Sequence, residues 1–96
     1  MIKHIVLMKF KKDAQSVVID GLENKLGALP GKIPEIISYE FGKDVVRSER
    51  SYDFALVSVF ENIDSLKRYQ VHPMHQEVLK IVKEQCESVI VADFVF

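Results

Sequence analysis

The opening strand-like segment of the chain is apolar on both of its sides, and this feature constrains the fold more than any other. In an extended strand, alternate side chains point to opposite faces. His4, Val6 and Met8 then share one face, and Ile5 and Leu7 occupy the other. A sheet that is covered on one side only alternates apolar residues with polar ones. We therefore expect this strand to need two coverings, one from helices of its own chain and one from elsewhere.

Periodicity and turn residues divide the rest of the chain into strands and helices. Strands are expected at residues 2–11, 36–46, 52–61 and 89–96, and helices at about 14–29, from 62 or 64 to about 70, and at about 73–87. Asp13 is expected to cap the first helix. The order β-α-β-β-α-β is typical of a ferredoxin-like α+β fold, a four-stranded antiparallel sheet with helices on one face.

The other face of that sheet is expected to bind a second copy of the chain. Ala55 and Val57 join Ile5 and Leu7 there, which makes an apolar patch larger than a monomer normally exposes. A chain of 96 residues also buries only a modest share of its surface alone. Two sheets packed face to face would give a homodimer, a dimeric α/β barrel.

Composition excludes several classes of partner. The chain has 13 basic and 14 acidic residues, a net charge of -1, which gives no electrostatic reason to bind nucleic acid or an anionic membrane. Cys86 is the only cysteine, so no internal disulfide forms and a cytoplasmic location is expected. Lysines interrupt the apolar N-terminal stretch, which fits neither a signal peptide nor a membrane span. One domain over residues 1–96 is predicted.

Three histidines and a tyrosine are the residues best suited to chemistry. Tyr69, His72 and His75 surround Pro73, which has no N–H to donate and interrupts a continuous helix. His72 is then expected near the N-cap of the last helix and His75 in its first turn, where the helix dipole disfavours a protonated imidazole. His75 also begins an apolar stripe that points to the sheet, made by His75, Leu79, Val82 and Cys86.

These residues support more than one interpretation. In the first, His4, Tyr69, His72 and His75 line a pocket between sheet and helices in which imidazoles move protons. In the second, they are core residues whose polar tips bind backbone groups. In a third, the three imidazoles hold zinc, but the break at Pro73 argues against it. We expect no metal, and we expect Cys86 to be a half-buried structural thiol.

Four segments together resemble the stress-responsive A/B barrel (Dabb) family. They are the opening Lys3-His4-Ile5-Val6-Leu7-Met8-Lys9-Phe10-Lys11, the central Phe41-Gly42-Lys43-Asp44-Val45, the stretch Tyr69-Gln70-Val71-His72-Pro73-Met74-His75 and the terminal Asp93-Phe94. The resemblance spans nearly the whole chain and implies a homodimeric barrel.

The resemblance also implies a chemistry, because one member of the family closes a linear poly-β-keto chain into an aromatic acid without metal or cofactor. Tyr69 and His75 match its catalytic tyrosine and histidine, and His4 and His72 match pocket histidines. Asp93 matches a nearby carboxylate, and it would orient the His4 imidazole if the first and last strands pair antiparallel. Val6 and Met8 would line the substrate pocket on the His4 face.

Two classes of function remain open from the sequence. One is a cofactor-free cyclase or isomerase-like enzyme that acts on a small hydrophobic carbonyl compound through Tyr69 and His75. The other is a non-catalytic dimer that binds a small ligand or is associated with stress. The feature that separates them is whether Tyr69 and His75 meet in one cavity.

Overall fold

A computed structural model describes residues 1–96, and its elements follow the predicted order. The strands are β1 (Ile2–Phe10), β2 (Ser38–Lys43), β3 (Phe54–Phe60) and β4 (Cys86–Val95), and the helices are α1 (Ser16–Ala28), α2 (Ile63–Val71) and α3 (Pro73–Gln85). A short 3₁₀ helix (Leu29–Gly31) follows α1. No helix has the length and apolar character needed to cross a membrane.

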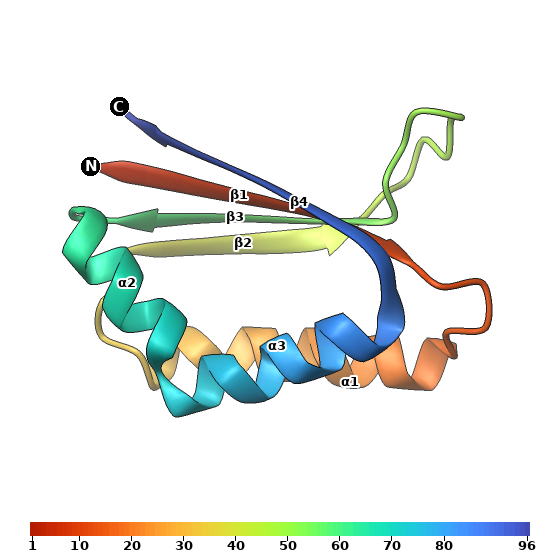
Figure 1. Cartoon of the computed structure of the whole chain (residues 1–96), viewed down its shortest axis with the longest axis horizontal. Helices are drawn as coiled ribbons and strands as arrows, with labels where there is room; N and C mark the ends of the chain where they lie inside the picture. Colours follow the sequence, from red (N-terminus) through yellow and green to blue (C-terminus); the bar gives the residue numbers. More distant parts are fainter.

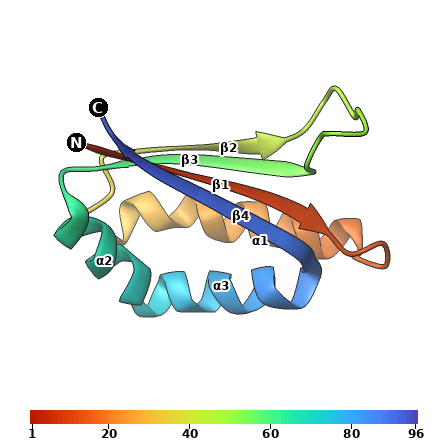
Figure 2. The same ribbon diagram turned by 45° about the horizontal axis from the view of Figure 1, so that its top comes forward.

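The four strands form one antiparallel sheet in the order β2-β3-β1-β4. The helices lie together on one face of this sheet, and α2 joins the end of β3 to α3 (Figures 1 and 2). Strand β1, the first in the chain, is therefore central, and it pairs with β3 on one edge and with β4 on the other. The predicted ferredoxin-like α+β fold is confirmed.

The core lies between the sheet and the helices. His4, Val6 and Met8 all point into it and are at most 8% exposed, as the alternation of β1 predicted. The first helix contributes Leu22 and Leu26, each 1% exposed. The largest fully buried side chains also include two from β3 and one from α2, namely Phe54, Phe60 and Tyr69. Burying aromatic side chains of this size supplies much of the favourable free energy of a small core.

The opposite face of the sheet carries no helix. The strand pairing brings Ile5 beside Val57 and Ala92, and Leu7 beside Ala55 and Ile90. We call this group, together with Phe94 on β4, the open sheet face; Ile90 and Phe94 are 47% and 46% exposed. A contiguous apolar surface of this kind is rare on a monomer unless something binds there.

Strand β4 is exposed on its helix side as well. Val89 and Val91 point to the side that carries the helices, yet they are 41% and 53% exposed. The reason is that β4, which leaves the end of α3 (Figure 2), is the edge strand of the sheet beside β1. The helix layer therefore covers β1 and β3 more completely than it covers β4.

Three boundaries differ from the sequence prediction. Helix α1 begins at Ser16 with Gln15 as its N-cap, and Asp13 lies outside it in a turn. The second strand is shorter than predicted, because the predicted residues on either side of Ser38–Lys43 form bends or irregular backbone. Cys86 does not continue the helical stripe; it is the first residue of β4. Helix α3 ends early because β4 must turn back to pair with β1.

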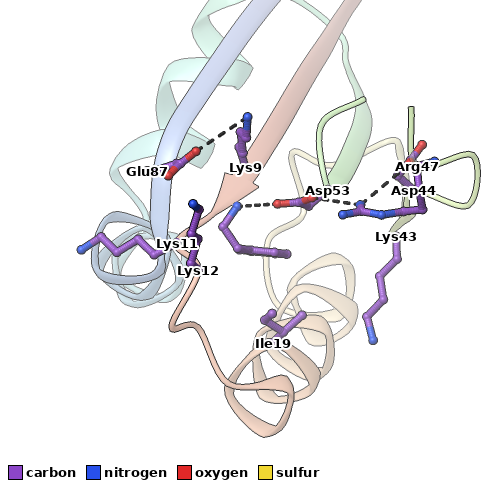
Figure 3. Close-up of a pocket in the computed structure, with 10 residues that line it drawn as sticks. Lys9, Lys11, Lys12, Ile19, Lys43, Asp44, Arg47, Asp53 and Glu87 are labelled. Carbon is purple, nitrogen blue, oxygen red and sulfur yellow. Dashed lines mark hydrogen bonds and ion pairs between the residues drawn. The ribbon is translucent and has the colours of Figure 1, made fainter. Parts of the chain in front are cut away.

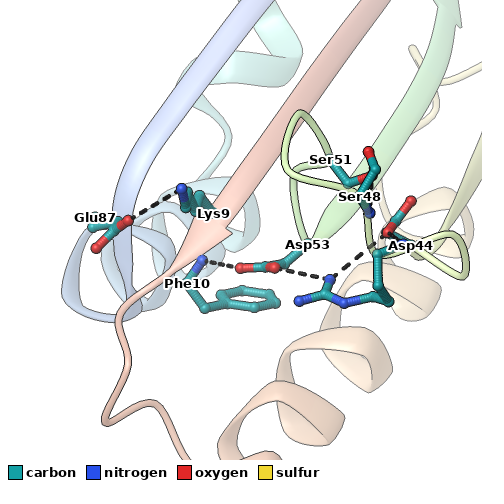
Figure 4. A network of polar contacts seen from close by, with 8 residues as sticks. Lys9, Phe10, Asp44, Ser48, Ser51, Asp53 and Glu87 are labelled. Carbon is teal, nitrogen blue, oxygen red and sulfur yellow. Dashed lines mark hydrogen bonds and ion pairs between the residues drawn. The ribbon is translucent and has the colours of Figure 1, made fainter.

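The loop between β2 and β3 extends beyond the sheet but is tied down at its base (Figure 4). The Asp53 carboxylate accepts a hydrogen bond from the Phe10 backbone N–H at 2.8 Å. It also forms an ion pair with Arg47, in which Nη1 lies 2.9 Å from Asp53 Oδ1. The Asp44 carboxylate accepts from the Arg47 backbone N–H at 2.7 Å. This contact helps hold Arg47 at φ 57°, a conformation that L residues seldom adopt.

The helix caps generate a first prediction. The side-chain oxygen of Asn62 accepts a hydrogen bond from the Ser65 backbone N–H at 2.9 Å at the start of α2, whereas Gln15 makes no such bond at the start of α1. Asn62→Ala should therefore cost about 1 kcal/mol of unfolding free energy in urea denaturation. Gln15→Ala is the matched control and should change it by less than about 0.5 kcal/mol. Equal losses would contradict the cap assignment.

Candidate functional site

A cavity of about 330 Å³ lies between the helix-facing side of the sheet and the helices. Its wall is mostly apolar, and the polar groups are concentrated where β1 faces the α2–α3 junction. Five predicted site residues line it: His4, Val6 and Met8 on β1, and Tyr69 and His75 on the helices. Val91 on β4 is also part of the wall. Because Val91 is half exposed, the cavity opens along the β4 side.

His75 has a defined tautomer when it is neutral. Its Nδ1 lies 3.0 Å from the carbonyl oxygen of Gln70, in the last turn of α2. A carbonyl can only accept, so Nδ1 carries the hydrogen and Nε2 keeps its lone pair. Gln76 Nε2 donates to the same carbonyl at 2.6 Å, which fixes the position of the acceptor. The neutral imidazole thus keeps a free lone pair on Nε2, which can accept a proton.

Burial lowers the pKa of His75 below its ordinary value of 6.5. The neighbouring His4 and His72 imidazoles act in the same direction, and the hydrogen bond to the Gln70 carbonyl opposes them. The removal of solvent from the charged form is the largest of these effects. His75 therefore remains neutral near pH 7, the state in which it accepts a proton.

Tyr69 sits beside His75 in the cavity wall. Their ring centroids are 4.3 Å apart, and the His4 ring lies 6.4 Å from the Tyr69 ring on another side. The Tyr69 hydroxyl contacts the Tyr39 hydroxyl, which reaches it from β2, at 2.8 Å. Burial raises the pKa of Tyr69 to about 12, so its phenol is a hydrogen donor throughout the neutral range.

His4 and Asp93 meet across the β1–β4 pair, as the predicted antiparallel pairing requires. His4 is directly opposite Asp93 in the register, and His4 Nδ1 lies 2.5 Å from Asp93 Oδ1. The carboxylate accepts, so Nδ1 carries the hydrogen and the orientation of the ring is fixed. Asp93 itself does not line the cavity. It contacts the cavity wall only through His4.

His72 lies outside the cavity, although the sequence grouped it with the pocket residues. Its Nδ1 accepts a hydrogen bond from the Met74 backbone N–H at 3.1 Å, and the residue is the N-cap of α3. The three imidazoles thus do not converge. No group of three or more histidine, cysteine or carboxylate side chains is close enough to hold a metal ion.

The thiol of Cys86 is half-buried at the start of β4, away from the cavity. Burial, with a smaller effect from the nearby Asp53 charge, raises the pKa of this thiol to about 11. A thiol that stays protonated at neutral pH is a weak nucleophile. The position fits the structural role expected from the sequence.

A larger hollow of about 600 Å³ lies elsewhere, where β1 runs into the α1 loop (Figure 3). Its wall is charged and includes none of the expected site residues. Most of its cations are already paired: Lys9 with Glu87, Arg47 with Asp53, and Lys43 with carboxylates on α1. Exposed pairs of this kind are compatible with a solvated surface. Of these two hollows, the smaller apolar cavity is the one lined by His4, Tyr69 and His75, the side chains suited to acid–base chemistry.

Two contributors to the site were missed by sequence reasoning. They are Tyr39, which lies within the predicted second strand but is not among the predicted site residues, and the backbone carbonyl of Gln70. The alternation that pairs Tyr39 with Phe41 on one face does predict that Tyr39 points to the helices. No sequence signal places the end of its side chain against Tyr69.

The fold and the cavity define a ferredoxin-like α+β protein with an internal pocket walled by histidine and tyrosine. The chain belongs to the stress responsive A/B barrel domain family, whose sequence profile matches residues 2–96. The family resemblance inferred from the motifs is confirmed.

Relatives align over nearly the full chain. An uncharacterized protein of Streptomyces coelicolor is 34% identical over 99 residues, with 100% of each chain covered. Olivetolic acid cyclase of Cannabis sativa is 23% identical over 95 residues, which cover 97% of this chain and 94% of the cyclase.

Solved structures agree on the fold. A dimeric protein of unknown function with a ferredoxin-like fold from Bacteroides fragilis superposes with a TM-score of 0.89 at 36% identity, covering 99% of this chain and 95% of that one. Hydroxynitrile lyase from Passiflora edulis gives 0.88 at 21% identity, with 99% and 92% covered. The lyase is evidence for the fold alone.

The environment of His75 generates a second prediction. Its lowered pKa means that the folded state disfavours the imidazolium, so its contribution to stability is present above pH 6.5 and is lost as the pH falls through the lowered value. NMR titration of the imidazole should give a His75 midpoint below 6.5. His75→Gln should remove the corresponding part of the acid dependence of the unfolding free energy. A midpoint at or above 6.5 would contradict the buried geometry.

Proposed function

We propose that the protein is a homodimeric, cytoplasmic enzyme that removes a proton from a small hydrophobic carbonyl compound without a cofactor, as a cyclase or isomerase does. The observation that supports this proposal is that His75 and Tyr69 line the same cavity, with ring centroids 4.3 Å apart. A base and a hydrogen donor on one reacting group are the two parts that enolate chemistry requires.

The reaction would begin at His75. Its Nε2 takes a proton from a carbon that lies between two carbonyl groups, and the electron pair of the broken C–H bond moves onto a carbonyl oxygen. The Tyr69 hydroxyl donates a hydrogen bond to this oxygen as it becomes an enolate. The step is a proton transfer with no oxidation or reduction, and no metal is required.

The same proton then completes the reaction. In a cyclase, the enolate carbon forms a bond to a distant carbonyl carbon of the same substrate, and the His75 imidazolium returns its proton to the new alkoxide oxygen. Loss of water from that product gives the unsaturated ring. In an isomerase, the proton returns to a different carbon instead.

The remaining predicted residues would serve substrate placement. Val6 and Met8 supply an apolar wall for the carbon chain. His4, whose imidazole ring is oriented by its hydrogen bond to Asp93, supplies a polar group. His72 would act indirectly, through the start of the helix that carries His75. The volume of about 330 Å³ is at the small end of ligand sites, which favours a short substrate.

A non-catalytic dimer that binds a small ligand or is associated with stress is the second candidate. It is favoured by the burial of Tyr69, which is only 1% exposed and packs on Phe60 with ring centroids 4.8 Å apart. A tyrosine in such packing also serves as an ordinary core residue. Activity measurements separate the two candidates.

The dimer we propose forms through the open sheet face. This face is apolar and carries no helix in one copy of the chain, and the related protein from Bacteroides fragilis is described as dimeric. A second copy would remove both open faces from water at once, which is the favourable step in such an association.

Replacement of the two cavity residues tests the enzyme hypothesis. The probe is a linear seven-carbon β-triketone in D₂O, and NMR follows deuterium entry at its methylene carbons, each of which lies between two carbonyl groups. Tyr69→Phe and His75→Ala should each lower the protein-dependent exchange rate by at least about 100-fold, because the acid–base step loses a participant.

The matched control is Tyr52→Phe, which removes a phenol hydroxyl that contacts Ser88 Oγ at 3.0 Å outside the cavity. It should leave the rate unchanged. Circular dichroism should show that all variants remain folded. If the wild-type protein does not accelerate exchange but the triketone perturbs the cavity resonances, the ligand-binding candidate is preferred.

A charge on the open sheet face tests the dimer. Val57→Asp should change the molar mass in light scattering at micromolar concentration from two chains to one, because a carboxylate would have to be buried without a partner. Val17→Asp, on α1 at a side chain that is 69% exposed, is the control and should remain dimeric. A monomeric wild-type protein would overturn the proposed assembly.

A further inference from the structure

One lateral row of polar residues crosses the helix-facing side of the sheet. Tyr39 on β2 is opposite Ser58 on β3, and Ser58 is opposite His4 on β1. His4 is in turn opposite Asp93 on β4. The next row along the strands is apolar in every position, and its members are Phe41, Leu56, Val6 and Val91. A single polar row in an apolar core is costly unless each group finds a partner.

The partners in this row are accounted for, except for one hydrogen. Asp93 binds His4, and Ser58 Oγ donates to the His4 backbone carbonyl at 3.3 Å. Tyr39 has a single hydrogen-bond partner, the Tyr69 hydroxyl at 2.8 Å. Between two phenols, one hydrogen occupies the contact and the other must point elsewhere.

The two possible directions leave different hydrogens free. If Tyr69 donated to Tyr39, its only hydrogen would be used in that contact, and the Tyr39 hydrogen would turn to solvent, because Tyr39 is partly exposed. If Tyr39 donates, the Tyr69 hydrogen is left over, and Tyr69 lines the cavity, where water or a ligand oxygen accepts it. Only the second direction leaves a hydrogen on the 1% exposed Tyr69 side chain for a group in the cavity.

We propose that Tyr39 is a positioning residue of the site: it donates its hydroxyl hydrogen to the Tyr69 oxygen and so directs the Tyr69 hydrogen into the cavity. This inference rests on the proposed function, which needs the Tyr69 hydroxyl as the donor to a substrate oxygen. Tyr39 does not line the cavity, so it acts on a substrate only through Tyr69.

The hydrogen bond also prepares Tyr69 for charge. As negative charge develops on a substrate oxygen, electron density on the Tyr69 oxygen rises, and a donor behind that oxygen stabilises it. In agreement, the contact with Tyr39 lowers the pKa of Tyr69 against the larger effect of burial, whereas the same contact adds to the raised pKa of Tyr39.

The direction of the bond is measurable by NMR, because the chain has only three tyrosines. In protein labelled with ¹³C at the tyrosine Cζ, Tyr→Phe variants assign each signal. A phenol that donates a hydrogen bond has its Cζ signal displaced toward the phenolate position. Tyr69→Phe should therefore move the Tyr39 signal away from that position, since Tyr39 loses its acceptor.

The opposite bond direction predicts a different result. Tyr39→Phe would then move the Tyr69 signal away from the phenolate position, and this outcome would overturn the inference. Tyr52→Phe is the control and should move neither signal. This measurement needs no substrate, so it gives an answer even if the proposed reaction fails.

The positioning role is tested by rate. With the linear β-triketone, Tyr39→Phe should lower kcat about threefold to tenfold with KM little changed, a smaller loss than Tyr69→Phe causes, since one neutral hydrogen bond is removed. A kcat equal to that of Tyr52→Phe would overturn the role. If the wild-type protein has no activity, the proposed function fails, and the NMR result still decides the hydrogen-bond direction.

Discussion

Strand β1 is hydrogen-bonded on both edges and apolar on both faces, and the other elements are arranged around it. Its helix-facing residues define the floor of the core, on which α1 and α3 pack. Its other face joins β3 and β4 in the open sheet face. Because side chains alternate strictly along a strand, a shift of one residue in pairing would exchange the two faces and place His4 outside the core. The register of this strand therefore fixes both the cavity and the proposed dimer surface.

The site depends on two local features that are separate in sequence. The register of the sheet places Tyr39, Ser58, His4 and Asp93 in one row, and no loop is needed to hold them. The interruption at Pro73 ends α2, exposes the Gln70 carbonyl and gives His75 an acceptor for its Nδ1 hydrogen. Groups held by strands and by a helix start are positioned more rigidly than groups on flexible loops, which suits a site that handles protons.

Most of the fold was predictable because its signals are local. Alternation on β1 and β3, the stop at Pro73 and the antiparallel return of the last strand predict that His4 lies beside Asp93. The failures have both local and tertiary causes. Gln15 replaces Asp13 at the start of α1, and Cys86 belongs to β4 because its backbone pairs with Phe10. The His72 side chain accepts a hydrogen bond from the start of α3 instead of facing the cavity. The Tyr39–Tyr69 contact joins residues that are 30 positions apart in the chain. These contacts depend on side-chain distances in the folded chain, and the periodicity of a sequence carries no information about such distances.

The position of β4 in the chain has a consequence for biosynthesis. Strand β1 leaves the ribosome before the other three strands, but one of its edges stays unpaired until residues 86–95 have been made. During that interval an apolar strand with free N–H and C=O groups is available to any other nascent chain. Pairing between the first and last strands is also a contact of long sequence separation, which slows folding. We expect that the sheet is completed only after β4 has left the ribosome, so the edge of β1 needs protection for longer than it would in a protein whose contacts are all local.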